Sequence, residues 1–347
     1  MSEALTETRP AAPSDSGTPI IELRGVSKRF SRKLDFAARL VKRLGVPVRE
    51  DVVHAVDGVD LSIRKGEVVG LVGESGCGKS TLGRMVAGIM PPTSGSILWR
   101  GKDLRSLSGA EAREAKLRTQ MIFQDPYASL NPRLRVTEIV GEAPLVHGLV
   151  RRRDLGPYVE EQLRRAGLDP SLRRRYPHQF SGGQRQRIGI ARALAVKPDF
   201  LVCDEAVAAL DVSIQAQILN LFMALRRELD LTYLFISHDL GVVEHLSDRV
   251  VIMYLGRVVE EAPAEEVFKH PNHPYTKALL AEVPRIEARK RAFAGVQGEI
   301  PSPLNPPSGC HFHPRCPFAM DRCKVERPAL REIAPGHRSA CHLNDGA

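Results

Sequence analysis

The chain has 347 residues, which is long enough for one large domain or two smaller ones. With 43% hydrophobic and 26% charged residues it has the composition of a globular protein, and no apolar run approaches the ~20 residues that cross a bilayer. The net charge of +9 would suit nucleic acid or an anionic lipid surface, but no platform of interleaved aromatic and basic residues occurs. We therefore expect no nucleic-acid partner.

The N-terminal segment is polar and lacks a basic stretch followed by an apolar one, so the sequence predicts no secretory signal peptide. We expect residues 1–18 to form a disordered leader. A role at a membrane would then require separate integral partners, with this chain on the cytoplasmic side.

Short apolar runs predict the first strands. Residues 20–30 suit an edge strand, and residues 55–63 suit a second strand. Residues 67–72 suit a third strand, which runs directly into a glycine-rich turn. Residues 81–90 then suit a helix that ends near the prolines at 91–92.

Residues 31–52, between the first two strands, are basic and carry apolar residues at helical spacing, which predicts an amphipathic helix. An inserted surface helix and a contact with the membrane surface both stay open as its role. The apolar residues are Leu34, Ala37, Leu40, Val41 and Leu44.

The second half of the chain alternates between helices and strands. Residues 136–180 lack strand signals and are rich in Arg and Leu, which predicts an inserted helical subdomain. Alternation then predicts a parallel sheet covered on both faces. The expected elements are 181–196, 199–203, 213–228, 232–237 and 248–253. After about residue 290, the sequence is rich in Pro, His and Cys, which predicts a small appended module.

The strongest motif runs from Gly73 to Ser80 and reads G-x-x-x-x-G-K-S between a strand and a helix. Its backbone N–H groups and the helix N-terminus suit phosphate oxygens. Lys79 would reach the β- and γ-phosphates, and the Ser80 hydroxyl would bind Mg²⁺. Cys77 stands at a free position of the motif and is expected to be a small filler. The expected ATP contacts here are Gly73, Glu74, Ser75, Gly76, Cys77, Gly78, Lys79, Ser80 and Thr81.

Two carboxylates follow an apolar strand at residues 200–203. Asp204 ends that strand, where α/β folds bind ligands, and a buried carboxylate there suits Mg²⁺. Glu205 is then placed to activate the attacking water as a general base.

Residues 180–187, which include Ser181, Gly182, Gly183 and Gln184, resemble the S-G-G-Q signature of ABC ATPases. A Ser-Gly-Gly turn that opens a helix is also a plausible anion site, because its N–H groups are unobstructed. The resemblance implies that this loop closes on the ATP bound by the other subunit of a dimer.

Four further residues match the family in order. Gln124 resembles the Q-loop glutamine, which contacts Mg²⁺ and the attacking water and links them to the membrane partner. His238 resembles the switch histidine on the γ-phosphate, and Asp211 resembles the D-loop aspartate. Phe30 is the aromatic residue whose position implies stacking on adenine.

The sequence departs from the family pattern at two positions. Ala206 stands where Pro often follows the catalytic Glu, and Ala208 stands where a Ser often precedes the D-loop Ala. Both changes leave the carboxylates in place. The loss of the hydroxyl at position 208 bears on coupling across the dimer rather than on hydrolysis.

The subclass resembles the oligopeptide/dipeptide importers, which include nickel and glutathione relatives. The segments that carry this resemblance are 125–132, 210–215, 273–276 and 309–317. It implies a homologous ATPase subunit as partner, in a heterodimer although a homodimer stays open, together with two integral permease subunits and an extracytoplasmic peptide-binding protein. The resemblance places the chain at the cytoplasmic face of the membrane. It does not identify the transported solute.

Four of the six cysteines lie in the tail. Clustered thiols in a reducing compartment suggest a metal site rather than disulfides. The resemblance implies an iron–sulfur cluster of the 4Fe–4S type, with free thiols or zinc as alternatives. The cysteines are Cys310, Cys316, Cys323 and Cys341. The neighbouring histidines, expected at the surface, are His311, His313, His337 and His342.

The expected architecture is an α/β P-loop fold of the ABC type, with an antiparallel β subdomain and a helical subdomain at about 130–180. The ATPase domain would span 19–289, and the Cys-containing C-terminal module would span 290–347. The cofactors would be ATP and Mg²⁺. The main alternative is an ABC ATPase that acts on nucleic acid or ribosomes, although neither a paired ATPase set nor a long coiled coil is evident.

Overall fold

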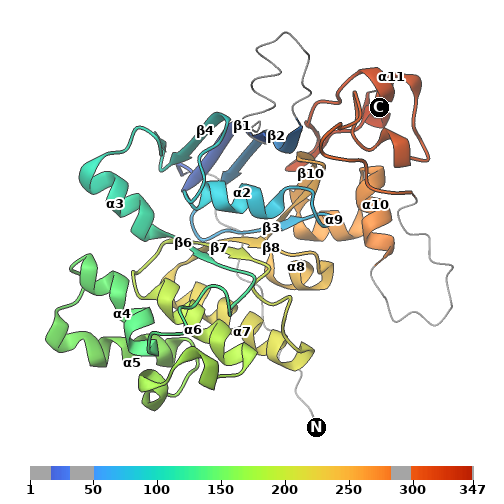
Figure 1. Ribbon diagram of the computed structural model, residues 1–347. Helices are drawn as coiled ribbons and strands as arrows, with labels where there is room; N and C mark the ends of the chain where they lie inside the picture. Colours follow the sequence, from blue (N-terminus) through green and yellow to red (C-terminus); the bar gives the residue numbers. More distant parts are fainter. Residues whose placement is uncertain (1–16, 32–50, 283–297, 346–347) are drawn as a thin grey trace, which may run out of the picture.

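The computed structural model describes residues 17–31, 51–282 and 298–345. These residues form an antiparallel sheet, a larger mixed sheet and helices on both faces of the larger sheet (Figure 1). Within these ranges, no helix combines the length and the apolar composition needed to cross a bilayer. Two predictions lie outside the described residues, namely most of the leader and nearly all of the amphipathic helix expected at 31–52. The proposed boundary at 289/290 lies outside them as well.

The antiparallel sheet has the strand order β2-β1-β4-β5. The predicted edge position of the first strand is wrong, because β1 pairs with β2 on one side and with β4 on the other. Ile21 and Leu23 of β1 are fully buried, as an interior strand requires. The strands are β1 (Ile21–Ser31), β2 (Val52–Ile63), β4 (Ser94–Trp99) and β5 (Lys102–Asp103).

The larger sheet has the order β11-β12-β10-β9-β3-β8-β7-β6. Strands β6, β7, β8, β3 and β9 run parallel, as the alternation predicted, while β10, β12 and β11 are antiparallel. The strands are β3 (Val68–Val72), β6 (Thr119–Ile122), β7 (Phe200–Asp204), β8 (Thr232–Ile236), β9 (Arg249–Tyr254), β10 (Arg257–Pro263), β11 (Arg331–Ala334) and β12 (His337–Ser339).

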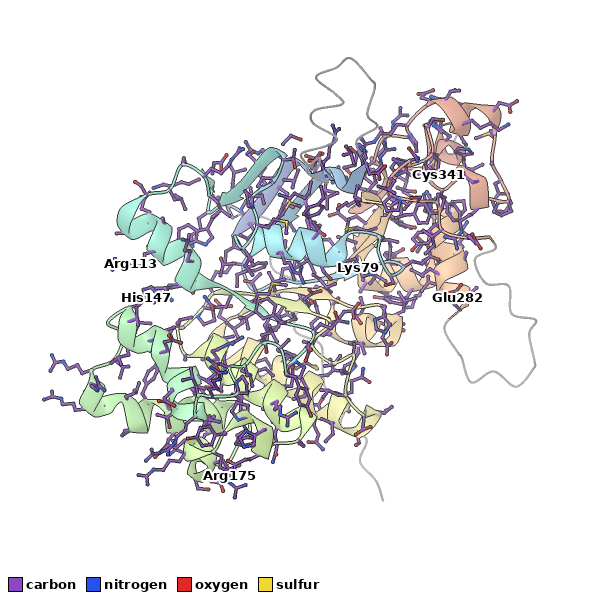
Figure 2. The ribbon with its side chains drawn as sticks, viewed as in Figure 1. Lys79, Arg113, His147, Arg175, Glu282 and Cys341 are labelled. Carbon is purple, nitrogen blue, oxygen red and sulfur yellow. The ribbon has the colours of Figure 1, made fainter. Side chains whose placement is uncertain are left out.

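Helices cover both faces of this sheet. Helix α2 lies between the two sheets, whereas α6 and α7 cover the opposite face together with the helical subdomain (Figure 1). The helices are α2 (Lys79–Val86), α3 (Gly109–Arg118), α4 (Val136–Val146), α5 (Leu155–Arg165), α6 (Gly182–Leu194), α7 (Val212–Leu229), α8 (Leu240–Leu246), α9 (Ala264–Lys269), α10 (Pro274–Ala281) and α11 (Asp321–Val325). Figure 2 labels Lys79 at the start of α2 and Arg175 in the helical subdomain at the bottom of the view.

Alternate residues of the central strands supply the two cores. Val202 of β7 packs into the core shared with α2, while its neighbours Leu201 and Cys203 pack into the core shared with α6 and α7. A period of two along a strand sends successive side chains to opposite faces. The continuous apolar runs in the sequence therefore reflect strands that are buried on both faces.

Helix α2 ends at Val86, earlier than the prolines at 91–92 had predicted. Gly88 has a φ of +69°, a left-handed conformation that glycine adopts without strain, and its N–H donates to the carbonyl of Met85. This turn satisfies a carbonyl at the helix end, so glycine rather than proline stops the helix.

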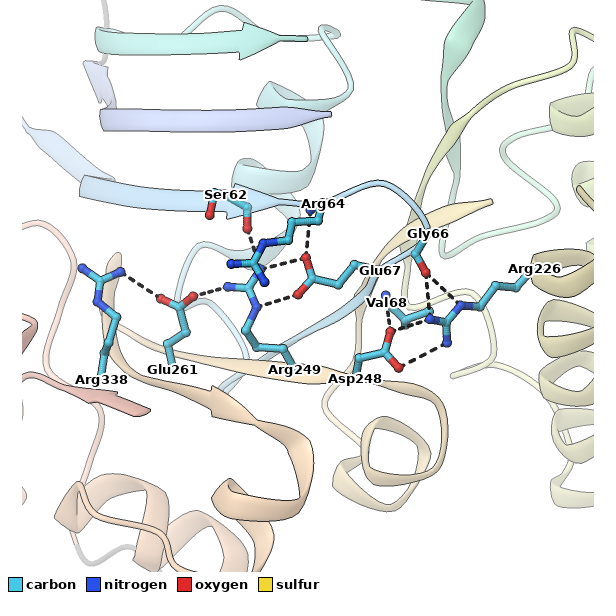
Figure 3. A network of polar contacts seen from close by, with 10 residues as sticks. All are labelled: Ser62, Arg64, Gly66, Glu67, Val68, Arg226, Asp248, Arg249, Glu261 and Arg338. Carbon is cyan, nitrogen blue, oxygen red and sulfur yellow. Dashed lines mark hydrogen bonds and ion pairs between the residues drawn. The ribbon is translucent and has the colours of Figure 1, made fainter. Parts of the chain in front are cut away.

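Arg249 of β9 joins β2, β10 and Glu67, the residue that precedes β3 (Figure 3). Its guanidinium donates to the carboxylates of Glu67 and Glu261 and to the carbonyl of Ser62. Burial disfavours the charge of Arg249, but the hydrogen bonds and negative charges of the two glutamates outweigh burial and raise its pKa. This network fixes the entry to β3, the strand that leads into the glycine-rich turn.

The C-terminal module is built into the core of the protein. Residues 260 and 261 of β10 pair with residues 339 and 338 of β12, so the module adds two strands to the larger sheet. Phe312 is buried in a third core with Tyr254 and Tyr275. The module therefore shares its apolar contacts with the ATPase core, which compensates for its own lack of apolar residues.

Candidate ATP-binding site

The predicted site residues meet at the carboxyl edge of four neighbouring strands. The segment Gly73–Ser80 follows β3, Gln124 follows β6, Asp204 ends β7 and His238 follows β8. These strands lie side by side in the order β3-β8-β7-β6. Open α/β sheets bind ligands at this edge, because their loops converge there.

Two of the three glycines in the P-loop (Gly73–Ser80) are required by close packing as well as by any phosphate. A Cβ at Gly73 would lie 2.2 Å from the carbonyl oxygen of Met253, and a Cβ at Gly78 would lie 2.1 Å from that of Ala55. Gly78 also has a φ of +104° and precedes the first residue of α2. A side chain at either position would displace the loop from the strands beside it.

Lys79 is 4% exposed, and its ammonium group is held inside the loop. Its Nζ donates to the carbonyl oxygens of Gly73 at 2.6 Å and Glu74 at 3.0 Å. Two backbone carbonyls thus solvate the buried cation, as a buried charge requires. Phosphate oxygens can replace them, so the lysine is positioned for an anion.

Ser80 and Asp204 form a pair suited to a divalent cation. The Ser80 hydroxyl donates to Asp204 Oδ1 at 2.8 Å. Burial raises the pKa of Asp204, while the hydrogen bond from Ser80 lowers it in part. A hydroxyl and a buried carboxylate at hydrogen-bond distance are the oxygen ligands that Mg²⁺ prefers. The residues therefore fit the predicted cation.

Glu205, Gln124 and His238 also come together. Gln124 Nε2 donates to Glu205 Oε2 at 2.6 Å, and His238 Nδ1 lies 3.4 Å from Glu205 Oε1. Glu205 has a φ of +48°, a left-handed backbone conformation that residues other than glycine rarely adopt. Such strained backbone conformations cluster at functional sites. The backbone turn directs the carboxylate away from the strand and toward the loops from β6 and β8.

The signature segment opens α6, which packs on the face of the larger sheet opposite α2. Ser181 Oγ accepts from the N–H of Gln184 at 3.3 Å, and Gln184 Oε1 accepts from the N–H of Ser181 at 3.1 Å. These reciprocal bonds form a capping box. A Cβ at Gly183 would lie 2.6 Å from a methyl group of Ile214 at the start of α7, which explains one of the two glycines. Asp211, at the N-cap of that helix, is exposed.

Phe30 is 39% exposed on β1 and pairs with Val53 of β2. Ala55 of the same β2 strand packs against Gly78 of the P-loop. An exposed aromatic ring on the strand beside the phosphate loop fits the predicted contact with a base. Thr81 is half-buried in the first turn of α2.

Sequence reasoning missed Arg315 of the C-terminal module. Its guanidinium binds the carboxylate of Glu74 in the P-loop across a separation of 241 residues. Only its place in a Cys-, His- and Pro-rich segment could have drawn attention to it, since no periodicity links positions so far apart.

The four tail cysteines converge, but they do not form a metal-binding group. All four line one cavity of about 20 Å³, room for about one water molecule. In the described part of the chain, no three His, Cys, Asp or Glu side chains are arranged to hold a metal ion. Burial raises the pKa of Cys310 to about 11 and also raises that of Cys316. The donor set fits a metal in type and number, whereas its present geometry does not.

The prediction that the tail histidines lie at the surface is wrong for three of them. His311 is 4% exposed and bonds to the carbonyl of Leu255, and His337 bonds to Glu260 at 2.7 Å. His342 is 6% exposed and bonds to Asp345. The ring nitrogens of His311 and His337 fix the module to the core, whereas His342 bonds within the module, to Asp345 and to the carbonyl of Glu326. Buried polar atoms need such partners.

Comparison with known proteins agrees with this geometry. Residues 56–208 match the model of the ABC transporter family, and residues 259–323 match that of the oligopeptide/dipeptide transporter C-terminal region. The oligopeptide transport ATP-binding protein AppF of Bacillus subtilis is 51% identical over 93% of this chain and 97% of its own length. A probable peptide ABC transporter ATP-binding protein of Sinorhizobium fredii is 51% identical over 84% of this chain and 83% of its own.

Solved structures show the same fold. The ATP-binding cassette MJ0796, in a dimeric post-hydrolysis state with ADP and Pi, covers 70% of this chain and 98% of its own at 28% identity, with a TM-score of 0.58. The cbiO1 protein of Clostridium perfringens covers 73% of this chain and 92% of its own, with a TM-score of 0.59.

Fold and site together define a P-loop ATPase of the ABC type. More particularly, the chain belongs to the family of ATP-binding subunits of oligopeptide/dipeptide ABC transporters. The resemblance that the sequence motifs indicated is thereby confirmed.

Proposed function

We propose that this chain hydrolyses MgATP at the carboxyl edge of the larger sheet and thereby powers import of oligopeptides or dipeptides. The observation that carries the proposal is the paired arrangement of Ser80 with Asp204 and of Gln124 with Glu205 on adjacent strands. The names of the relatives refer to peptide transport, which favours transport over a role on nucleic acid or ribosomes.

The P-loop supports the binding of the triphosphate. Its backbone N–H groups and the start of α2 would receive the phosphate oxygens, as helix N-termini commonly do. Lys79 would exchange the carbonyls of Gly73 and Glu74 for the β- and γ-phosphates. Phe30 would stack on the adenine ring. Because phosphate oxygens replace the two carbonyls around Lys79, the buried ammonium group keeps a partner throughout binding.

Ser80, Asp204 and Gln124 are the residues that would hold Mg²⁺. The ion, when bound, neutralises charge on the phosphate oxygens. Glu205 would accept a proton from the attacking water, and Gln124 at 2.6 Å would orient that carboxylate. His238, 3.4 Å from Glu205, would contact the γ-phosphate from the next loop.

The signature residues would act in a dimer. Ser181, Gly182, Gly183 and Gln184 open α6, which packs on the face of the larger sheet opposite α2, and the family resemblance assigns them to the ATP of the other subunit. A homologous partner, in a heterodimer, would present its signature segment to the ATP of this chain. The signature segment of this chain would in turn contact the ATP of the partner. Asp211 would line the same interface. Two permease subunits would dock on the dimer at the cytoplasmic face of the membrane, with an extracytoplasmic peptide-binding protein completing the importer.

Titration with ATP and assay of hydrolysis test this function. We expect binding that requires Lys79, and hydrolysis that requires Mg²⁺ and is lost on chelation. In the assembled importer, peptide uptake should follow hydrolysis. Failure of the intact chain to bind ATP would refute the site, whereas hydrolysis without peptide uptake by the assembled importer would refute the substrate.

We further propose, on the resemblance and on the convergence of the thiols, that the tail cysteines hold an iron–sulfur cluster of the 4Fe–4S type. Such a cluster would serve as a structural link, and it would require the small cavity between the thiols to open. Anaerobically purified protein should absorb near about 400 nm through thiolate–iron charge transfer, and Cys316→Ser should abolish this band. Stoichiometric zinc, or no metal at all, would refute the cluster.

A further inference from the structure

The C-terminal module reaches the P-loop through a buried ion pair. Arg315 Nη1 donates to Glu74 Oε2 at 2.8 Å, and Arg315 Nη2 donates to Glu74 Oε1 at 2.9 Å. The side chain of Arg315 is 4% exposed and that of Glu74 is 18% exposed, so the pair is shielded from water. A bidentate guanidinium–carboxylate pair fixes orientation as well as distance.

A second contact holds the backbone of the same residue. The N–H of Glu74 donates to the hydroxyl of Tyr275 at 2.9 Å. The Tyr275 ring is fully buried and packs against Tyr254 and Phe312, with centroids 4.7 Å and 5.4 Å away. Arg315 Nη1 also donates to the Tyr254 hydroxyl at 3.3 Å. Glu74 is thus held at its side chain and at its backbone by one packed unit.

The held residue lies where the phosphate loop has little packing of its own. Ser75 and Gly76 are exposed, and a Cβ at Gly76 would meet nothing within 4 Å. The carbonyl of Glu74 also accepts from Lys79 Nζ. A loop with an open apex loses conformational freedom when it closes on phosphate, and a fixed anchor reduces that loss before ATP arrives. Glu74 is the anchor on the β3 side of the apex.

We propose that Arg315 is a positioning residue for ATP: by fixing Glu74, the C-terminal module preorganises the P-loop for the triphosphate. This inference rests on the proposed ATP site. It makes the module, which lies far along the chain, a determinant of nucleotide affinity. Arg315 bonds to Glu74 and Tyr254 and not to Glu205, the proposed general base. We therefore expect its loss to weaken ATP binding rather than to slow the chemical step.

The main test compares Arg315→Gln with Arg327→Gln. Arg327 also joins the module to the core, through the carbonyl of Asp57 in β2 at 3.3 Å, and so controls for a general loosening of the module. We expect Arg315→Gln to weaken MgATP binding about 10- to 100-fold, the worth of a hydrogen-bonded charged group. The KM for ATP should rise with little change in kcat, as loss of uniform binding predicts.

Two further measurements separate positioning from instability. Hydrogen exchange of the P-loop amides in the nucleotide-free protein should quicken in Arg315→Gln and stay unchanged in Arg327→Gln. Glu74→Gln should weaken binding as well, and the double variant Glu74→Gln with Arg315→Gln should be no weaker than the worse single variant, because both remove one contact.

Three results would overturn the inference. The first is an ATP affinity of Arg315→Gln equal to that of the unmodified chain, and the second is equal weakening by Arg327→Gln. The third is fully additive losses in the double variant. Each presupposes that the unmodified chain binds ATP through Lys79, so a failure of the proposed site itself would be recognised beforehand.

Discussion

Replacement of Glu205 by Gln should separate ATP binding from ATP hydrolysis. The amide has the size of the carboxylate, and its oxygen can still accept the hydrogen bond that Gln124 donates at 2.6 Å. What is lost is the group able to take a proton from water. Because the pKa of Asp204 is raised by burial and further by Glu205, removing this negative charge also favours the ionised form of Asp204. Nucleotide binding should therefore persist.

The size of the effect follows from the role of the carboxylate. A positioned general base contributes about 10²- to 10⁴-fold, which corresponds to about 2.7–5.5 kcal/mol of the activation barrier at 1.36 kcal/mol for each factor of ten. No other side chain within hydrogen-bond distance of Glu205 among the described residues is a carboxylate, since its partners are Gln124 and His238. We therefore expect a loss toward the upper end of that range.

Single-turnover hydrolysis and equilibrium ATP titration on the same preparations measure this effect. The matched control is Glu265→Gln, which makes the same change at an exposed position of α9 and should leave both quantities unchanged. Glu205→Gln should bind ATP, hydrolyse it slowly and accumulate as a closed dimer. Turnover close to that of the unmodified chain would refute the general-base role, and loss of ATP binding would show that Glu205 holds the nucleotide instead.

Three further substitutions test other parts of the structure. Lys79→Ala should weaken ATP binding itself, measured by titration, because Lys79 is the buried cation of the P-loop. Ser181→Arg should leave ATP binding to this chain intact but abolish turnover of the assembled pair, since the added cation would block closure on the partner's ATP. Arg249→Met should lower the free energy of unfolding in denaturant by about 3–5 kcal/mol, the usual effect of leaving buried charges such as Glu67 and Glu261 without a partner.

Each of these three has a contrary outcome, and Lys79→Ala and Arg249→Met each have a matched control. Lys65→Ala removes an exposed lysine and should not alter ATP affinity. If Lys79→Ala binds ATP as tightly as the unmodified chain, Lys79 does not bind the phosphates. If Ser181→Arg loses its own ATP binding, the signature does not act in trans. Arg24→Met breaks an exposed ion pair and should change stability little, so an equally small effect of Arg249→Met would contradict the structural role of the network.

The parallel core was predictable because its signals are local. The apolar runs at 200–203 and 232–237 correspond to β7 and β8, and the glycine-rich segment follows β3 as the motif requires. Once parallel strands are assumed, their carboxyl ends must share an edge, so the meeting of Lys79, Asp204 and His238 follows from chain order. Site residues given by motif spacing could therefore be named before the fold was known.

Positions within the antiparallel sheet were less predictable. The sequence of β1 resembles an edge strand, but β1 is an interior strand because β4 pairs with it. Since β4 is short and partly exposed, its sequence gives little indication of a strand. The tail histidines show the same limit, because His337 is buried where β12 pairs with β10 and its ring bonds to Glu260. Burial of a polar residue depends on the elements that pack over it, which neighbouring residues do not reveal.

By itself, the sequence determined the class of ATPase, the phosphate loop and the carboxylates, because these depend on residue types at short and fixed spacing along single strands and turns. Only the tertiary structure decided that the helix opened by the signature packs on the face of the sheet opposite α2 and that Arg315 binds Glu74 across 241 residues. The physical reason is that contacts between distant segments arise when whole strands and helices pack, and no local periodicity encodes which side chains then meet.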